Sequence, residues 1–447
     1  MIAVDAETKR VQQLATDPGV SAWVSANAGS GKTYVLARRV VRLLLSGADP
    51  GAILCLTFTK AAAAEMASRV FGILAGWTRL DDEALDHELS DYQGFTDGAE
   101  RIRARRLFAE ALETPGGLKI QTIHAFCERL LHQFPLEAGV AASFEVLDER
   151  ATAILIDSAK RAVIEEASAG PDTPLGRAFA RVLEASSDLG IEEALAAVIA
   201  KRDALVGFLD GAGSEEAAIA ALRTTLGLSG GETADSLRGE IAAGIPLGRD
   251  EIRRLAELLG ASGAKHRGLA VPLGTVAGAP EPGDRAQAWL DFLMTAGRKK
   301  MRELSSLAPK AVFTAWPGLE ELLLAERARV EALLDKIAGA EAAQSTAALM
   351  TLGLSVIRRY ERAKQRRGAL DFEDLIVRTA ELLTRSGASA WIHYKLDRGL
   401  DHVLVDEAQD TSPRQWQVIA ELVSEFFSGE GAGPRRRTLF AVGDEKQ

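Results

Sequence analysis

The chain contains little cysteine and no long apolar stretch. Its two cysteines, Cys55 and Cys127, are too few for a disulfide framework and lack the spacing of a metal site. No apolar run approaches the ~20 residues that a membrane-spanning helix needs, and no basic segment followed by an apolar one opens the chain. We therefore expect a cytoplasmic protein without membrane association, with both cysteines small, buried and reduced.

Positive charge is also in short supply. The 447 residues include 53 Lys and Arg against 63 Asp and Glu, a formal net charge of −10 at pH 7. This balance excludes a uniformly basic nucleic-acid-binding protein, but it leaves room for a local patch that contacts nucleic acid. Hydrophobic residues make up 47% of the chain, which excludes a disordered protein. At this length we expect two or three domains.

Strand-like and helix-like segments alternate near both ends of the chain. Apolar runs of strand length lie at 21–25, 53–58, 402–405 and 438–442, and helical periodicity follows the first two at 33–45 and 61–70. Alternation of this kind predicts βαβ units and a parallel sheet. The runs at 53–58 and 402–405 are apolar throughout, as expected for strands that are buried on both faces.

The central stretch, residues 146–367, has a different composition. It is rich in Ala, Leu, Glu and Arg, shows helical periodicity and has few strand signals. Glycine-rich breaks at 227–231 and 260–283 interrupt it. We interpret it as a helical insertion between two parts of one α/β domain, residues 1–145 and 368–447.

A glycine-rich loop joins the first predicted strand to the first predicted helix. It comprises Ala26, Asn27, Ala28, Gly29, Ser30, Gly31, Lys32 and Thr33. Glycines let backbone N–H groups approach phosphates, and the start of a helix adds partial positive charge. Lys32 can reach the β- and γ-phosphates, and the Thr33 hydroxyl can hold Mg²⁺. The loop therefore predicts a site for ATP and Mg²⁺, although Ala26 stands where the strict motif has glycine.

Two carboxylates follow the predicted strand at 402–405. Asp406 and Glu407 would lie at the carboxyl edge of the sheet, where open α/β sheets bind ligands. We expect Asp406 to hold Mg²⁺ through water and Glu407 to orient and activate an attacking water. With the phosphate loop on the same sheet, these residues indicate nucleotide hydrolysis.

Several segments resemble motifs of the UvrD/Rep-type superfamily 1 helicases, in the order of that family. They are Gln12 ahead of the loop, the stretches 56–66, 121–126 and 370–375, the acidic stretch 406–411, and the terminal stretch 442–447, which is similar to motif III. The resemblance implies a RecA-like P-loop NTPase lobe (1A) with a large, mostly helical 1B insertion. It implies an ATP-dependent 3′–5′ DNA helicase that acts on single strands and duplex ends.

The same resemblance implies roles for individual residues. Gln12 would read adenine, and Gln409 and Gln447 would link the γ-phosphate to DNA. The stretch 23–33 looks most like AddA, the helicase–nuclease component of the AddAB complexes of double-strand break repair and recombination, which implies an AddB-like partner. Membership of the RecB-like or plain UvrD-like groups stays open at this point.

Two segments that follow strands are the expected contacts to single-stranded DNA. They supply Thr57, Phe58, Thr59 and Lys60, and, from a second loop, Thr122, His124 and Phe126. Backbone contacts and base stacking suit a protein that must grip a strand without sequence preference. Core packing is the alternative for the rings, above all for Phe58.

Two basic clusters are candidates for contact with duplex DNA. One comprises Arg298, Lys299, Lys300 and Arg302, and the other Arg358, Arg359, Arg362, Lys364, Arg366 and Arg367, next to Tyr360. The simpler interpretation of each is a solvated helix face.

The sequence ends at Gln447, inside the segment that is similar to motif III. The family has a second RecA-like lobe, whose arginines stabilise the transferring phosphoryl group, and AddA has a nuclease domain. The 447 residues hold neither, so we expect them to bind ATP–Mg²⁺ and DNA but to turn over little. Two alternatives are a nucleotide-gated DNA-binding module and a small-molecule kinase, which would not need the segments at 57–60 and 122–124.

Overall fold

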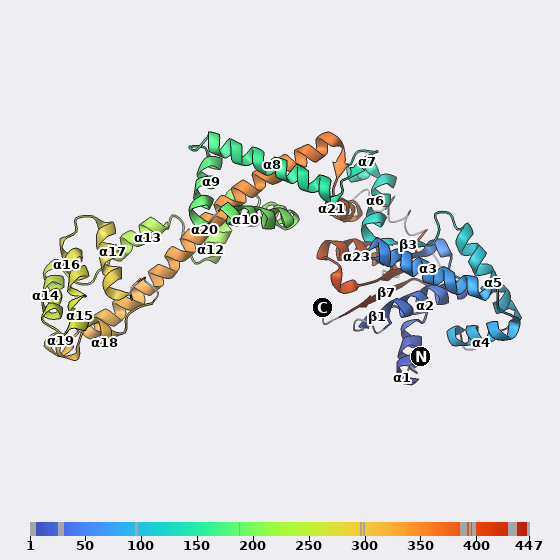
Figure 1. Ribbon diagram of the computed structural model, residues 1–447, viewed down its shortest axis with the longest axis horizontal. Coiled ribbons are helices and arrows are strands. Elements are labelled where there is room, and N and C mark those ends of the chain that lie inside the picture. The colour runs from blue at the N-terminus through green and yellow to red at the C-terminus, as the bar shows by residue number, and fades with distance from the viewer. Residues whose placement is uncertain are drawn as a thin grey trace. The chain divides into compact units, whose positions relative to one another are not determined.

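The computed structural model describes residues 6–25, 31–93, 97–186, 188–295, 297, 300–384, 391–392, 395, 399–427 and 436–444. Contacts divide the chain into two compact units (Figure 1). Unit 1 comprises Met1–Ile154 and Arg362–Gln447, and unit 2 comprises Leu155–Glu361. Among the described residues, no helix is long and apolar enough to cross a membrane.

A parallel sheet of five strands forms the centre of unit 1 in its described part. The strand order is β1 (Ala22–Ser25), β7 (Thr438–Gly443), β6 (His402–Val405), β2 (Ile53–Thr57) and β3 (Lys119–Thr122). Every neighbouring pair runs parallel, so the carboxyl ends of all these strands lie at one edge. The predicted α/β fold with a parallel sheet is confirmed.

Helices cover both faces of this sheet (Figure 1). On one face, Cys55, Leu404 and Phe440 pack against α2 (Lys32–Leu45), α3 (Lys60–Trp77), α4 (Asp82–Gln93) and α5 (Gly98–Glu113). On the other face, Leu56, Val405 and Ala441 pack against α6 (Ile123–Gln133), α7 (Pro135–Ala138), α21 (Phe372–Thr384) and α23 (Pro413–Phe427). Burial on two faces explains why the strands are apolar without alternation. Cys55 and Cys127 are free and buried, as predicted.

The described part of unit 2 is helical. Its helices are α8 (Glu149–Ala169, which begins in unit 1), α9 (Pro174–Ala185), α10 (Asp188–Ala200), α11 (Arg202–Ala212), α12 (Glu215–Thr225), α13 (Ala234–Ala243), α14 (Arg249–Gly260), α15 (Ala264–Arg267), α16 (Ala270–Gly278), α17 (Pro282–Leu293), α18 (Leu304–Leu307), α19 (Lys310–Ala315) and α20 (Leu319–Arg367, which ends in unit 1). The fully buried Trp289 and Phe292 lie in its core, and Trp289 donates a hydrogen bond of 2.7 Å to Glu326.

One of the two predicted glycine-rich breaks is wrong. Residues 227–231 do separate two helices, and Gly227 and Gly231 adopt positive φ values there. Residues 260–283, in contrast, contain α15 and α16. Leu273 and Val276 of α16 are fully buried, and burial of such side chains outweighs the ~1 kcal/mol that each helical glycine costs.

The second predicted basic cluster is divided between exposed and buried residues, and Arg358, Arg362, Arg366 and Arg367 are exposed. Lys364 is only 2% exposed and forms ion pairs with Asp374 at 2.5 Å and Asp371 at 3.2 Å, so its interpretation as a duplex contact is wrong. Tyr360 is fully buried, and Arg359 pairs with Glu166. Arg298 and Lys299 of the first cluster lie outside the described residues.

A second, two-stranded parallel sheet joins β4 (Glu145–Val146) to β5 (Ala369–Leu370). It places the strand at which the chain leaves the first part of unit 1 beside the strand at which the chain enters the second part. The short helix α1 (Ala6–Ala15) precedes β1 and packs against α2.

Candidate nucleotide-binding site

Predicted site residues converge at the carboxyl edge of the main sheet. Asp406 and Glu407 directly follow β6, Asp444 follows β7, and Thr57 ends β2. The backbone N–H of Asp406 donates to the Leu56 carbonyl at 2.8 Å, so the two central strands end in register. The acidic residues therefore stand where the strand pattern predicts them.

Lys32 and Glu407 are in direct contact although they lie 375 positions apart. The Lys32 Nζ atom donates to a Glu407 carboxylate oxygen at 2.7 Å, and the Lys32 side chain is only 9% exposed. An ammonium group this deeply buried needs an anionic partner, and the Glu407 carboxylate is the partner here. Lys32 opens α2 directly after Gly31, whose φ of 88° suits glycine.

The backbone of Glu407 is strained. Its φ of 48° lies in the left-handed region, and it is the only described non-glycine residue there. Such a conformation costs of order 1–3 kcal/mol and occurs often at functional sites. A hydrogen bond of 3.0 Å from Glu407 N to the Asp406 carboxylate helps to hold it. Burial raises the pKa of Glu407, but hydrogen bonds from Gln409 and Lys32 and the Lys32 charge lower it by more, so the side chain is ionised at neutral pH.

Asp406 is the buried member of the acidic pair. Burial, and then the negative charge of Glu407, raise the pKa of Asp406 to about 6. In such surroundings, a nearby cation stabilises the ionised form of the carboxylate. Thr33, half-buried in the first turn of α2, supplies a hydroxyl oxygen. These two oxygen donors fit Mg²⁺, which usually binds one or two protein oxygens and keeps several waters. Accordingly, the described residues contain no cluster of three or more His, Cys, Asp or Glu side chains for a metal.

Gln409 connects Glu407 to the end of β7. It lies in the 3-10 turn η3 (Ala408–Asp410), and its amide N–H donates to the Glu407 carboxylate at 2.8 Å. Its carbonyl oxygen accepts a hydrogen bond of 3.0 Å from Asp444 N. A Cβ atom at Gly443 would lie 2.9 Å from that oxygen and 3.3 Å from the Ala408 side chain. Because glycine has no Cβ atom, position 443 leaves room for the Gln409 side chain.

The structure leaves part of the predicted site undescribed. Residues 26–30 of the loop and residues 445–447, which include Gln447, lie outside the described residues. Gln12 is described: it is half-buried, near the carboxyl end of α1.

The predicted DNA contacts divide into exposed and buried residues. Phe58 is 50% exposed, and Thr59 and Lys60 are exposed beside it, so core packing, the alternative for Phe58, is wrong. Phe126 is only 7% exposed and packs in the core of unit 1, which leaves no ring face for a base.

The remaining predicted DNA contacts have structural partners. Thr57 and Thr122 are buried. The Thr57 hydroxyl donates to the Thr59 carbonyl, and Thr122 caps α6 by accepting from Ala125 N at 3.2 Å. The second segment is therefore a strand end and a helix start rather than the predicted loop.

One aromatic residue beside this segment was not predicted as a contact. Phe372, 40% exposed at the start of α21, packs edge-on against His124 with ring centroids 5.5 Å apart. Burial lowers the pKa of His124, so the imidazole is neutral at pH 7. The stretch 370–375 marks this region in the sequence, but a motif does not reveal which ring is exposed.

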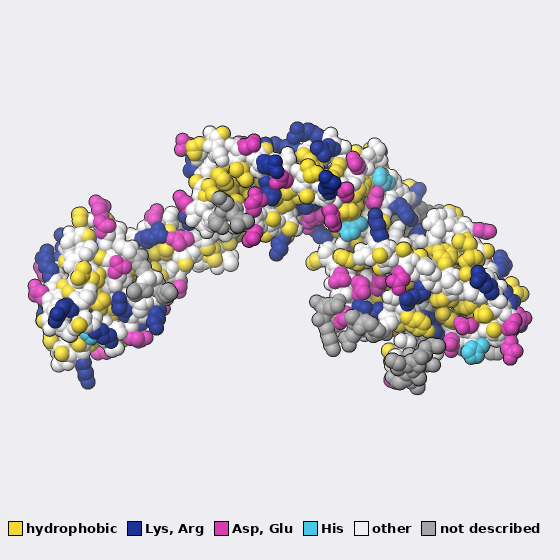
Figure 2. Space-filling model, viewed as in Figure 1, with side chains coloured by type: hydrophobic (Ala, Val, Ile, Leu, Met, Phe, Trp, Pro, Cys, Tyr) yellow, Lys and Arg dark blue, Asp and Glu magenta, His cyan; other side chains and the backbone are white. Residues whose placement is uncertain are grey.

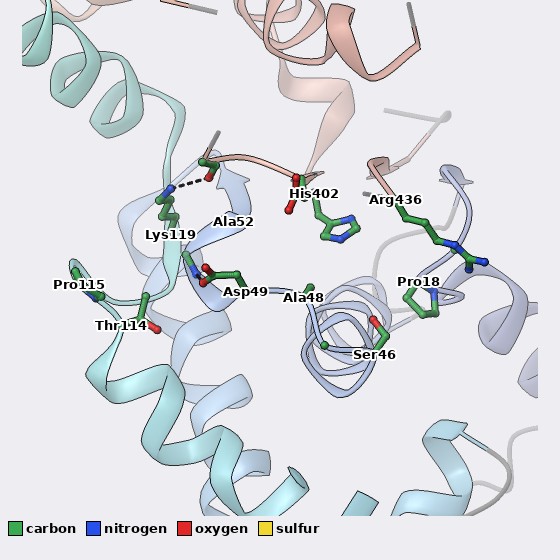
Figure 3. A pocket seen from close by; sticks show the side chains of 15 residues that line it. Pro18, Ser46, Ala48, Asp49, Ala52, Thr114, Pro115, Lys119, His402 and Arg436 are labelled. Atoms are coloured by element: carbon green, nitrogen blue, oxygen red, sulfur yellow. Dashed lines mark hydrogen bonds between the residues drawn. The ribbon is translucent and has the colours of Figure 1, made fainter. Parts of the chain in front are cut away.

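A cavity of about 740 Å³ lies at the opposite, amino edge of the sheet (Figure 3). His402 and Lys119, the first residues of β6 and β3, lie on its wall with Pro18, Asp49 and Arg436. Lys119 donates to the Gly399 carbonyl at 3.1 Å. This cavity is therefore distinct from the edge that holds Lys32, Asp406 and Glu407.

On the side of each unit that Figure 2 shows, charge does not mark out a binding face. Figure 2 shows Lys and Arg interspersed with Asp and Glu over the visible face of each unit, in keeping with the net charge of −10.

The parallel sheet covered by helices, the Lys-Thr pair that opens α2, and the carboxylates after β6 define the class of P-loop α/β proteins. Comparison with known families narrows this class. The UvrD/REP helicase N-terminal domain family matches residues 7–447, nearly the whole chain. The chain therefore belongs to the UvrD/REP helicase family, and the predicted family is confirmed.

Relatives named as the A subunit of an ATP-dependent helicase/nuclease are similar to this chain. The protein of Desulforudis audaxviator (strain MP104C) is 30% identical over 465 aligned residues, which cover 95% of this chain and 34% of that protein. The protein of Latilactobacillus sakei subsp. sakei (strain 23K) is 25% identical, over 98% of this chain and 48% of that protein. The chain thus spans between a third and a half of the length of these relatives.

Proposed function

We propose that this chain is the ATP- and DNA-binding front part of an AddA-type helicase. In this proposal residues 1–145 and 368–447 form RecA-like lobe 1A, and residues 146–367 form the helical 1B insertion. The whole protein would translocate 3′–5′ on DNA in the cytoplasm during double-strand break repair and recombination, with an AddB-like partner. Family membership and the naming of the relatives as a helicase/nuclease component support it.

The contact between Lys32 and Glu407 carries the proposal. It brings the lysine that would bind phosphate within 2.7 Å of the carboxylate that would orient water. Asp406 and Thr33 would hold Mg²⁺, which when bound neutralises charge on the β- and γ-phosphates. Glu407, ionised at neutral pH, can accept a hydrogen bond from the attacking water. To do so it must give up its contact with Lys32, whose positive charge then faces phosphate.

DNA would lie along the same edge of lobe 1A. The exposed rings of Phe58 and Phe372 offer faces for base stacking, and Thr59 and Lys60 offer backbone contacts. His124 supports Phe372 through their edge-on contact. Thr57 and Thr122 shape the segments that carry these residues. Gln409, bonded both to Glu407 and to Asp444, would couple the hydrolysis site to that surface.

Nucleotide binding and single-turnover hydrolysis test the proposal. The chain should bind ATP–Mg²⁺, Lys32→Ala should abolish binding, and Glu407→Gln should retain binding but abolish hydrolysis in a single turnover. Asp410→Asn, an exposed neighbour of the same charge, is the matched control and should behave like the wild type. Equal ATP affinity in the wild type and Lys32→Ala would refute the assignment of the site.

A second function, a nucleotide-gated DNA-binding module without turnover, has one observation in its favour. Glu407 is held by two donors, Lys32 and Gln409, so hydrolysis requires their rearrangement. Single-turnover hydrolysis with and without oligo(dT) separates the two functions. A chain that binds ATP and changes its DNA affinity, yet never hydrolyses ATP, would establish the second one. Membership of the UvrD/REP helicase family removes the small-molecule kinase alternative.

A further inference from the structure

Two arginines of α2 hold the carboxyl end of α1, the helix that carries Gln12. Arg42 Nη1 donates to the Gln13 carbonyl at 2.6 Å and to the Thr16 hydroxyl at 2.8 Å. Arg39 Nη1 donates to the carbonyl of Ala15 at 3.4 Å. The two helices are therefore connected by hydrogen bonds from charged donors, which are stronger than neutral ones.

These bonds complete the capping of α1. The last four carbonyl groups of a helix have no partner inside it. The backbone N–H groups of Thr16 and Asp17 serve the first and third of them at 3.0 and 3.1 Å. Arg42 serves the second and Arg39 the fourth. Their positive charges also suit the negative end of the helix dipole, so α1 is fixed in both position and direction.

Arg39 extends this connection to the sheet. Its side chain is fully buried and donates to the carbonyls of Asp17 and Val20 and, at 3.0 Å, to the Thr438 hydroxyl at the start of β7. That hydroxyl lies 2.8 Å from Nδ1 of His402. Burial and the Arg39 charge lower the pKa of His402 to about 4, so its neutral ring accepts a hydrogen bond from the Thr438 hydroxyl. The Thr438 hydroxyl is thus held by His402 and in turn helps to hold the Arg39 side chain in place.

Helix α2, which carries Arg39 and Arg42, begins at the proposed phosphate-binding residues. Arg39 and Arg42 follow Lys32 by seven and ten residues. At ~1.5 Å per residue they lie about 10 and 15 Å further along the axis of α2. Three residues apart, they share one face of the helix, the face against α1. One rigid element therefore touches the phosphate site at its start and the Gln12 helix near its end.

We propose that Arg39 and Arg42 are positioning residues for base recognition. By fixing α1 on α2 they set the distance between Gln12 and Lys32, and so determine the preference for adenine over guanine. The inference rests on the proposed function, in which Lys32 binds phosphate, and on the role in reading adenine that the family resemblance implies for Gln12. A glutamine amide can pair with the adjacent donor and acceptor of adenine, whereas guanine presents two acceptors there. A displaced amide loses this discrimination, while the phosphate contacts remain.

The test compares Arg42→Ala with the wild-type chain. Dissociation constants for ATP–Mg²⁺, GTP–Mg²⁺ and inorganic tripolyphosphate are measured by calorimetry, with thermal melting to verify the fold. The preference for ATP over GTP should fall about five- to tenfold, as the loss of one or two net hydrogen bonds predicts, with tripolyphosphate affinity unchanged. Arg39→Lys, which keeps the charge but loses the forked donor, should act in the same direction.

Controls separate positioning from general damage. Arg103→Ala removes a bond of 3.3 Å from Arg103 to the carbonyl of Leu45, at the far end of α2, and should keep the base preference. Gln12→Ala should lose the preference, and adding Arg42→Ala to it should cause no further loss. An unchanged preference in Arg42→Ala, or losses that add in the double variant, would overturn the inference alone. Gln12→Ala with full preference would overturn the role of Gln12 and with it this inference, and a wild type that does not bind ATP would overturn the proposed function as well.

Discussion

Replacing Asp406 by Asn should stabilise the metal-free protein while removing the carboxylate proposed to hold Mg²⁺. Asp406 is buried beside Glu407, and these surroundings raise its pKa from the usual 3.8 to about 6. The folded state therefore binds the Asp406 proton more tightly than the unfolded state does. Stability falls as pH rises from about 4 to about 6, and the full loss is present above that range.

The size of the effect follows from the two pKa values. A rise from 3.8 to about 6 corresponds to about 3 kcal/mol of stability lost at pH 8. Asn keeps the shape and the oxygen that accepts from Glu407 N, but it adds an amide N–H₂ that needs partners. We therefore expect a gain of about 1–3 kcal/mol for Asp406→Asn at pH 8 and little gain near pH 4.

Hydrogen exchange measures this gain in the right part of the molecule. Native-state exchange of a peptide that covers β6 reports the opening of unit 1, in buffer with a chelator so that no divalent cation binds Asp406. Asp410→Asn, on the exposed side of the same turn, should shift the opening free energy by less than ~0.5 kcal/mol. A variant that is less stable than the wild type at pH 8, or equally stabilised at pH 4 and pH 8, would refute the reasoning.

Three further predictions concern other parts of the fold. Lys364→Met should destabilise unit 1 by about 3–5 kcal/mol in the same exchange assay, because it removes the cation that forms ion pairs with Asp371 and Asp374. Lys336→Met, at a more exposed ion pair, should change the stability of unit 2 little. Gly443→Ala should crowd the glutamine amide beside it, so DNA stimulation of ATP hydrolysis should fall while ATP affinity, measured by calorimetry, is retained. Phe372→Ala should weaken oligo(dT) binding in fluorescence anisotropy by about 1–3 kcal/mol, whereas Phe126→Ala should instead lower stability by about 3–5 kcal/mol.

Local patterns in the sequence were sufficient to predict four of the five strands of the main sheet, but not β3. The strands at 53–57 and 402–405 are recognisable because burial on both faces demands uninterrupted apolar runs. Lys32 and Thr33 are recognisable because a phosphate cradle needs a fixed order of residues between a strand and a helix. Such signals span only a few residues, so they can be detected without knowledge of the tertiary structure.

Exposure of single side chains could not be predicted in this way. Phe58 and Phe126 both stand in motif segments, yet the first is exposed and the second is in the core. Lys364 sits in a run of basic residues, but two aspartates that follow it at 371 and 374 turn it inward. In each case the neighbour that decides the outcome comes from another element of the fold. The predicted break at 260–283 is wrong for the same reason, since packing rather than propensity makes α16 helical.

The contact that matters most to the proposed chemistry also has no local signal. Lys32 bonds to Glu407, Glu407 to Gln409, and Gln409 to the backbone of Asp444, a continuous path from the start of α2 to the end of β7. Glu407 accepts both donors through one oxygen, Oε2, so a change in its contact with Lys32 changes the acceptor that Gln409 sees. Gly443 lies against the other end of the same amide, since a Cβ atom there would lie 2.9 Å from the Gln409 carbonyl oxygen. Hydrogen bonds thus connect Lys32, the proposed phosphate ligand, to Asp444 at the end of β7.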